Sequence, residues 1–353
     1  MFISVTLRKI SNRELFLLKQ LNIKYVDLSL NVFPHYQKDL PIFFQKFDFK
    51  KEKRNILKII KVLNERGILI NSFNGPPIRD ALFGKPCGEK QVNDFCNFIK
   101  MLGEKQIPIA HIKLSVRGFG PAEIPGRYVK KQERGYKMGA FSLELMKKEL
   151  EKKNMDSLWA HHFRERLTFK DFFSNCLKVL REIVPFAEEH NVKLVWHPED
   201  PPVEDNRLLP GFSTLEKINK LLNNVSSPNF GMIFCTGTLY ESGLNIYKLI
   251  DLFGKKGKIF HVHFRNVKGN LLNATGYEEV ALDDGDMNML NILKSLKKIG
   301  YDAAINPDHV PIFIDNKHIE QHGTAYALDD PNALPGFLYS IGYIKALISA
   351  IEL

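Results

Sequence analysis

The chain has 353 residues, of which 44% are hydrophobic and 25% charged, and its formal net charge is +10. This composition is ordinary for a soluble globular protein, and the length accommodates one β/α barrel of ~250 residues with an insertion. The lysines are spread along the predicted helices, without the aromatic-interleaved stripe that is typical of a nucleic-acid surface. We therefore expect one elaborated domain, residues 1–353, and no nucleic-acid partner.

The N-terminus and the cysteines indicate the cellular compartment. Arg8 and Lys9 interrupt the first apolar stretch, so no signal peptide is predicted, and no apolar segment of membrane length is recognised. The four cysteines form no CxxC pair, which suggests neither a disulfide framework nor a structural zinc motif. We expect a cytoplasmic protein that has no membrane partner.

Apolar runs alternate with helical patterns through the first 115 residues. Strands are predicted at residues 3–7, 25–30, 68–73 and 109–115. Helices are predicted at residues 11–21, 54–66 and 90–105, with Ser11 as the cap of the first and Gly67 as the stop of the second. This alternation predicts four strand–helix units of a parallel sheet.

Residues 116–167 break the pattern. Their first part is rich in glycine and proline, and a single charged helix is predicted at residues 142–153. A segment this long after a barrel strand is more often a functional loop than a linker. We predict a lid that is inserted after the fourth strand. The alternative is an exposed basic insertion that does not contact substrate.

Four more strands are predicted in the second half, and each ends in a residue that can bind a metal. Their sequences are KLVWHP, FGMIFC, IFHVHF and AAINPDH, and they are nearly continuous apolar runs, as buried parallel strands are. Helices are predicted at residues 169–190, 213–222, 244–253, 287–299 and 338–351. Eight strands and eight helices predict an α/β fold, a (β/α)8 TIM barrel, whose carboxyl strand ends converge on one face.

The candidate ligands are His197, Cys235, His263 and Asp308, which lie 38, 28 and 45 positions apart. Such nitrogen, sulfur and oxygen donors suit manganese, iron, cobalt or zinc and argue against magnesium. His261 and His263 share one strand face. We choose His263 because it is nearer the functional end, and His261 is then a packed or supporting residue.

Five segments together resemble mannonate dehydratases. They are WHPEDPP at 196–202, FCTGT at 234–238, HVHFRNV at 261–267, EEVALDDGDMNM at 278–289 and NPDHVP at 306–311. The resemblance implies a barrel related to the xylose-isomerase-like barrels and a divalent metal, usually manganese. It also implies that water is removed from D-mannonate to give 2-keto-3-deoxy-D-gluconate. The N-terminal half departs from the family pattern, with GRYVKKQERGYKMG where an aromatic, Arg-containing segment is usual.

The resemblance implies that the four candidate ligands carry the metal and that His309 is the acid/base residue beside it. Tyr326 is the candidate for the family's catalytic tyrosine. Dehydration takes a proton from the carbon beside a carboxylate, and a bound metal stabilises the enediolate that forms. Arg265 can grip a carboxylate and Asn266 can bond a hydroxyl, so both are candidate substrate contacts. For Arg265, an ion pair with Asp283, Asp284 or Asp286 is an equal alternative.

Three functions therefore compete. The first is a metal-dependent dehydratase of a sugar acid, and the second is a sugar isomerase or epimerase on the same barrel. The second would normally use several carboxylate ligands, whereas this chain offers one. The third is a metal-dependent nucleic-acid enzyme, which is suggested by the net charge and by the existence of metal-dependent barrels that cut DNA. A small-molecule sugar acid is the expected partner, and a homo-oligomer is expected.

Overall fold

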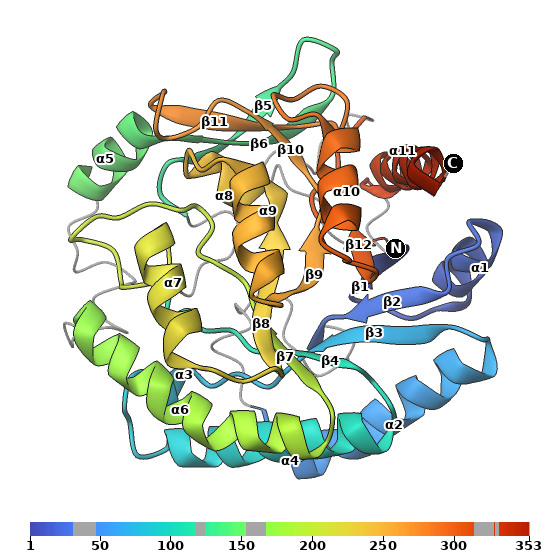
Figure 1. Ribbon diagram of the computed structural model, residues 1–353, viewed down its shortest axis with the longest axis vertical. Coiled ribbons are helices and arrows are strands. Elements are labelled where there is room, and N and C mark those ends of the chain that lie inside the picture. The colour runs from blue at the N-terminus through green and yellow to red at the C-terminus, as the bar shows by residue number, and fades with distance from the viewer. Residues whose placement is uncertain (31–46, 118–123, 153–166, 314–327, 329–331, 353) are drawn as a thin grey trace.

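The computed structural model describes residues 1–30, 47–117, 124–152, 167–313, 328 and 332–352. A closed barrel of eight parallel strands lies at its centre, surrounded by helices (Figure 1). The predicted TIM barrel is confirmed, and its strands follow the order β1-β12-β9-β8-β7-β4-β3-β2. The barrel strands are β1 (Phe2–Leu7), β2 (Tyr25–Leu28), β3 (Leu69–Asn74), β4 (Ile109–His111), β7 (Lys193–Trp196), β8 (Phe230–Cys235), β9 (Ile259–His263) and β12 (Ala304–Asn306).

Each large helix lays an apolar face on the barrel. In α9 the buried residues Ile246, Leu249, Ile250 and Phe253 recur at helical spacing, and the Asn245 side chain caps the first turn. Burying four such side chains contributes about 1.5–3 kcal/mol each. The helices are α1 (Asn12–Gln20), α2 (Phe49–Glu65), α3 (Arg79–Leu82), α4 (Gly88–Glu104), α5 (Leu143–Lys152), α6 (Phe169–Glu189), α7 (Leu215–Asn224), α8 (Thr236–Glu241), α9 (Ile246–Lys255), α10 (Met289–Lys298) and α11 (Leu334–Glu352).

A second sheet was not predicted. It has four antiparallel strands in the order β10-β11-β6-β5 and lies at the upper edge of the view in Figure 1. Half of it comes from the predicted insertion, which forms a hairpin and α5 where only an irregular segment and one helix were expected. The strands are β5 (Arg127–Lys131), β6 (Lys137–Ser142), β10 (Asn266–Lys268) and β11 (Gly276–Val280). The insertion is thus joined to the loop that follows β9.

The last helix corrects one expectation from the sequence. α11 has 19 residues and a mean hydropathy of 1.4, so it is long and apolar enough to cross a membrane by length and composition alone. Only 28% of that window is buried. However, α11 packs against β1 and α10, and helices that belong to the core of soluble proteins pass the same test. The helix is therefore weak evidence for a membrane span.

Candidate functional site

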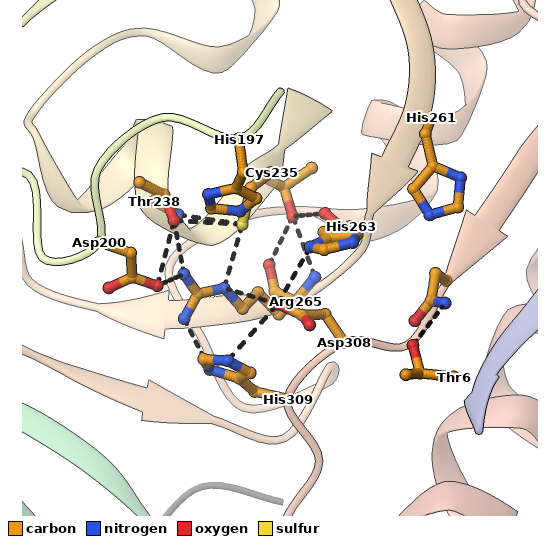
Figure 2. Close-up of polar contacts among 12 residues, drawn as sticks. Thr6, His197, Asp200, Cys235, Thr238, His261, His263, Arg265, Asp308 and His309 are labelled. Atoms are coloured by element: carbon orange, nitrogen blue, oxygen red, sulfur yellow. Dashed lines mark hydrogen bonds and ion pairs between the residues drawn. The ribbon is translucent and has the colours of Figure 1, made fainter. Parts of the chain in front are cut away.

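Three of the predicted ligands meet where neighbouring barrel strands end. Cys235 is the last residue of β8 and lies opposite His263, the last residue of β9, while His197 follows β7 directly. Their ligand atoms all lie within 4.8 Å of one another. Asp308, two residues beyond β12, places Oδ2 3.2 Å from His263 Nδ1. The structure therefore brings all four predicted ligands together (Figure 2).

The protonation states in this cluster suit a metal ion. His197 Nδ1 lies 2.6 Å from the Pro198 carbonyl, so it donates there and leaves Nε2 free to act as a ligand. Burial raises the pKa of the Cys235 thiol, but Arg265 and hydrogen bonds from His197 and His263 outweigh it and hold that pKa well below the ordinary value. A thiolate, two imidazoles and a carboxylate fit a divalent transition metal.

A second cluster of ligand-type residues lies beside the first. Carboxylate and imidazole atoms of Asp200, Glu279 and His309 also lie within 4.8 Å of one another. Two guanidinium groups already occupy this cluster. Arg127 Nη2 lies 2.9 Å from Asp200 and 3.2 Å from Glu279, and Arg265 Nη1 lies 2.8 Å from Glu279. This second group is therefore an ion-pair cluster between arginines and carboxylates.

Arg265 lies between Asp200, Cys235 and His309, as Figure 2 shows. Its side chain is 0% exposed and forms ion pairs with Asp200, Glu241 and Glu279. Its Nε also donates to Cys235 Sγ at 3.1 Å. The predicted grip on a substrate carboxylate is not supported, because protein groups engage every nitrogen. The alternative partners Asp283, Asp284 and Asp286 are wrong too: Asp283 pairs with Arg134 and Asp284 with Lys268.

Asn266 does not offer a group to substrate either. Its amide nitrogen donates to the carbonyls of Leu282 and Met287 at 2.9 and 3.0 Å. Its oxygen accepts from the backbone N–H groups of Val267 and Met287. All four hydrogen bonds that an amide side chain readily makes are therefore used to hold the loop after β10. The predicted contact with a substrate hydroxyl has no free donor.

His309 is held by a buried carboxylate that the sequence analysis did not identify. Its Nδ1 lies 2.9 Å from Glu279 Oε1, and its Nε2 lies 3.5 Å from Asp308. Burial raises the pKa of Glu279, but His309 and Arg127 outweigh it and lower that pKa to about 2. Arg265 Nη1 lies 2.9 Å from the same Nδ1, so Glu279 and Arg265 together hold the ring, and Nε2, on the side of Asp308, is the atom that can exchange a proton.

Two further histidines, His261 and His111, lie near the cluster. His261 is buried one layer below the cluster, with Nε2 3.6 Å from Asp27 and Nδ1 3.3 Å from Asn71. His111, which ends β4, is buried, and this burial together with His197 and His263 lowers its pKa well below the ordinary value. Tyr326 lies outside the described residues. No contact of the predicted catalytic tyrosine is therefore assigned.

The sequence analysis missed four charged residues of this site: Arg127, Asp200, Glu241 and Glu279. A signal existed for Glu279, because in β11 the side chains of Glu278 and Glu279 alternate. Glu278 pairs with Lys130 at the surface, whereas Glu279 is 1% exposed. No local pattern indicates that this strand lies at the barrel mouth, because it reaches that place through the unpredicted second sheet.

Known proteins are similar to this chain over the part that contains the candidate site. The family model described as D-mannonate dehydratase (UxuA) matches residues 142–353, which is more than half of the chain. A curated mannonate dehydratase from Enterococcus faecalis is 34% identical over 160 residues, which cover 44% of each chain. One from Thermotoga maritima is 29% identical over 262 residues, 72% of this chain and 65% of that protein. The chain thus spans less than two thirds of these relatives.

Solved structures extend the likeness over the whole chain. The crystal structure of mannonate dehydratase from Streptococcus suis serotype 2 superposes with a TM-score of 0.74 at 21% identity, covering 100% of this chain and 95% of that one. A D-tagatose 3-epimerase-like protein gives 0.57 at 16% identity, covering 99% and 100%. These two likenesses establish the fold, and the match of the family model over residues 142–353 establishes that the chain belongs to the D-mannonate dehydratase family.

Proposed function

We propose that this protein is a metal-dependent hydro-lyase that removes water from a sugar acid, D-mannonate, and gives 2-keto-3-deoxy-D-gluconate. One observation carries the proposal: His309, oriented by Glu279, lies beside the cluster of His197, Cys235, His263 and Asp308. A polarising ion and a proton-transfer group are thus adjacent. Removing water from a sugar acid needs both.

The resident metal would be held by His197, Cys235, His263 and Asp308, and we propose Mn²⁺. When bound, the ion supplies positive charge where a substrate carboxylate gains electron density. The low pKa values of Cys235 and Asp308 support this role, because both donors are ionised without help from added base. For Asp308, burial raises the pKa, and His263, His309 and Arg265 outweigh that effect.

His309 moves one of the two protons that the reaction transfers. The carbon beside the carboxylate loses a proton, and the neighbouring carbon loses its hydroxyl, which takes up a proton and leaves as water. Glu279 holds the His309 ring so that Nε2 lies on the side of Asp308, one of the proposed ligands. We propose that Tyr326, which lies outside the described residues, completes the second transfer.

The donor set also favours dehydration over epimerisation. The barrel fold is common to both, so fold alone does not separate them. A sugar isomerase or epimerase would normally bind its metal through several carboxylates, and this cluster contains a single one, Asp308, with a thiolate from Cys235. A cytoplasmic location, a homo-oligomeric state and the absence of a nucleic-acid partner remain part of this proposal.

The test is turnover of D-mannonate by metal-stripped protein with and without added Mn²⁺, beside a His309→Asn variant. We expect product only with metal, and a decrease in kcat of about 10²–10⁴-fold in the variant, the usual contribution of a positioned acid/base group. The affinity for Mn²⁺ should change little, because His309 is not a ligand. Turnover by His309→Asn at the parent rate would remove the role given to that residue.

A wild-type protein that binds Mn²⁺ but leaves D-mannonate unchanged would refute the substrate and keep the site. A panel of other aldonates and of ketoses would then separate a different dehydration from isomerisation. Release of water, followed as a 2-keto-3-deoxy product, distinguishes the two reactions directly.

A further inference from the structure

We infer that the wall of the barrel mouth formed by the ends of β3 and β4 binds a hydroxyl group of an acyclic sugar-acid substrate, and that His111 accepts the hydrogen bond. This inference rests on the proposed function, because it assigns a second part of the same substrate. The cluster of His197, Cys235 and His263 lies at the ends of β7, β8 and β9, and β4 is the next strand of the barrel. A sugar acid that binds at the cluster therefore extends toward one of the neighbouring walls.

The strand register directs His111 into the mouth. Ile109 packs inside the barrel against Val195 and Ile233, so alternate residues along β4 face inward. His111 is the next inward residue and lies opposite Val195, which is two residues before His197. The chain remains extended beyond β4, and the same alternation carries Lys113 to the same side. Both side chains line one cavity at this wall.

A hydrogen bond fixes the protonation of the His111 ring. Its Nδ1 lies 3.1 Å from the Asn74 side-chain oxygen, which only accepts, so Nδ1 carries the proton. The other nitrogen, Nε2, is then an acceptor. It is buried and has no hydrogen-bond partner among the residues that the structure describes. An unsatisfied buried acceptor costs about 1–3 kcal/mol, so its retention at the mouth of a site points to a donor from outside the protein.

The backbone at this wall is held rigidly, which suits a group that recognises one position of a substrate. The N–H of Gly75 donates to the His111 carbonyl at 2.8 Å, and this bond ties the end of β3 to the end of β4. A Cβ at Gly75 would lie 2.3 Å from the Phe95 ring, so only glycine allows this approach. Asn74, and with it the proton on His111, is thereby fixed in place.

The chemistry of the wall selects a hydroxyl group. A carboxylate has no proton to offer a bare imidazole nitrogen, whereas a sugar hydroxyl donates readily. Lys113, exposed at the same cavity, adds a cation that favours an anionic, hydroxyl-rich molecule. A neutral apolar ligand would leave the His111 Nε2 acceptor unsatisfied. The hydroxyl concerned lies on the part of the substrate that does not react.

The experiment pairs protein variants with substrates that lack single hydroxyls. Kinetics of His111→Leu and the parent protein, loaded with Mn²⁺, are compared on D-mannonate and on its 4-deoxy, 5-deoxy and 6-deoxy analogues. We expect His111→Leu to lower kcat/KM for D-mannonate at least about 10-fold, the value of one hydrogen bond left unmade. For one deoxy analogue the same change should have less than about a twofold effect, because the partner hydroxyl is already absent.

Asn74→Ala provides an independent variant, since it removes the group that holds the proton on Nδ1. It should give the same pattern with a smaller loss, and Ile78→Val, an apolar change in the same cavity, should leave all four substrates alike. An equal loss on all three analogues in both variants would overturn the assignment of His111. Absence of turnover by the parent protein would overturn the proposed function as well, and that result appears before any variant is tested.

Discussion

Two neighbouring clusters in the barrel mouth both contain side chains that can bind a metal, but the clusters differ in the cationic side chains that contact them. His197, Cys235 and His263 form one, and Asp200, Glu279 and His309 form the other, with ligand atoms within 4.8 Å in each case. Two guanidinium groups, those of Arg127 and Arg265, form ion pairs with the carboxylates of the second, whereas the first receives one guanidinium contact, from Arg265 Nε to Cys235 Sγ. Proximity of ligand atoms therefore does not define a metal site. Whether such a group of atoms can hold a metal ion depends on the basic side chains that already neutralise its charge.

The two clusters also depend on each other. Arg265 is the link, because its Nε donates to Cys235 Sγ while its other nitrogens bind Asp200 and Glu279. Arg265 lowers the pKa of the Cys235 thiol, and it also balances the negative charge of Asp200 and Glu279. Arg265 thus favours the thiolate form of Cys235 in the proposed metal cluster. Removing Arg265 should therefore affect both clusters.

The largest effect is expected from Arg265→Met. Two buried carboxylates, Asp200 and Glu279, would lose a partner, and the free energy of unfolding should fall by about 3–5 kcal/mol. Urea unfolding measures this loss. The control is Lys130→Met in the partly exposed pair with Glu278, which should cost less than about 1 kcal/mol. Equal losses in the two variants would show that burial does not set the cost.

The second prediction concerns the affinity of the first cluster for metal. Cys235→Ala removes a proposed ligand, and the affinity for Mn²⁺ should fall by more than about 100-fold, since even groups behind the ligands are worth 10–100-fold. Calorimetric titration of metal-stripped protein measures it. Cys176→Ala is the matched control, because Cys176 is buried in α6 away from the cluster. Unchanged affinity in Cys235→Ala would place the metal elsewhere.

The effect that is smallest near pH 5 and depends on pH concerns two buried glutamates with opposite behaviour. Burial raises the pKa of Glu241 well above its ordinary value, and the nearby Asp200 and Glu279 add to this against Arg265. Above the unfolded pKa of about 4.3, the unfolded chain releases this proton and the folded chain keeps it. The parent protein therefore loses stability as the pH rises, relative to Glu241→Gln.

We expect Glu241→Gln to change the free energy of unfolding by less than about 1 kcal/mol at pH 5 and to become relatively more stable toward pH 8, by at most about 1.4 kcal/mol for each pH unit. Urea unfolding of metal-stripped protein at several pH values tests this. Glu279→Gln is the control, because the low pKa of Glu279 predicts a loss above pH 5. A pH-independent difference for Glu241→Gln would mean that Glu241 is ionised.

The barrel was predictable from the sequence because its signals are local. Buried parallel strands are apolar along their whole length, as in FGMIFC of β8, and the helices between them show periodic apolar residues. The four proposed metal donors could be found for the same reason, since each lies at the end of such a run or just beyond it. The confirmed closure of eight strands then brings those ends together without further information.

The ion-pair cluster was not predictable because its members come from the second sheet and from segments that follow barrel strands. Arg127 lies on β5 and Glu279 on β11, strands of mixed composition that include Gly, Lys and Glu. Their pairing through β6 links residues more than a hundred positions apart, which leaves no local pattern. The roles assigned to Arg265 and Asn266 failed because their partners were unknown. The role of an Arg in a motif can be assigned only when the carboxylates that lie near it in the fold are known.

The closure of the barrel has a consequence for synthesis of the chain. β1 pairs with β12, with Phe2 opposite Ala304, so the first strand made must wait for one of the last. Until then β1 and β12 are both open edges, and loop closure over such a distance is slow. Amino-terminal trimming that removes β1 would leave β12 paired with β9 alone, beside Asp308 and His309. A proteolytic nick far from the catalytic face would thus inactivate the protein.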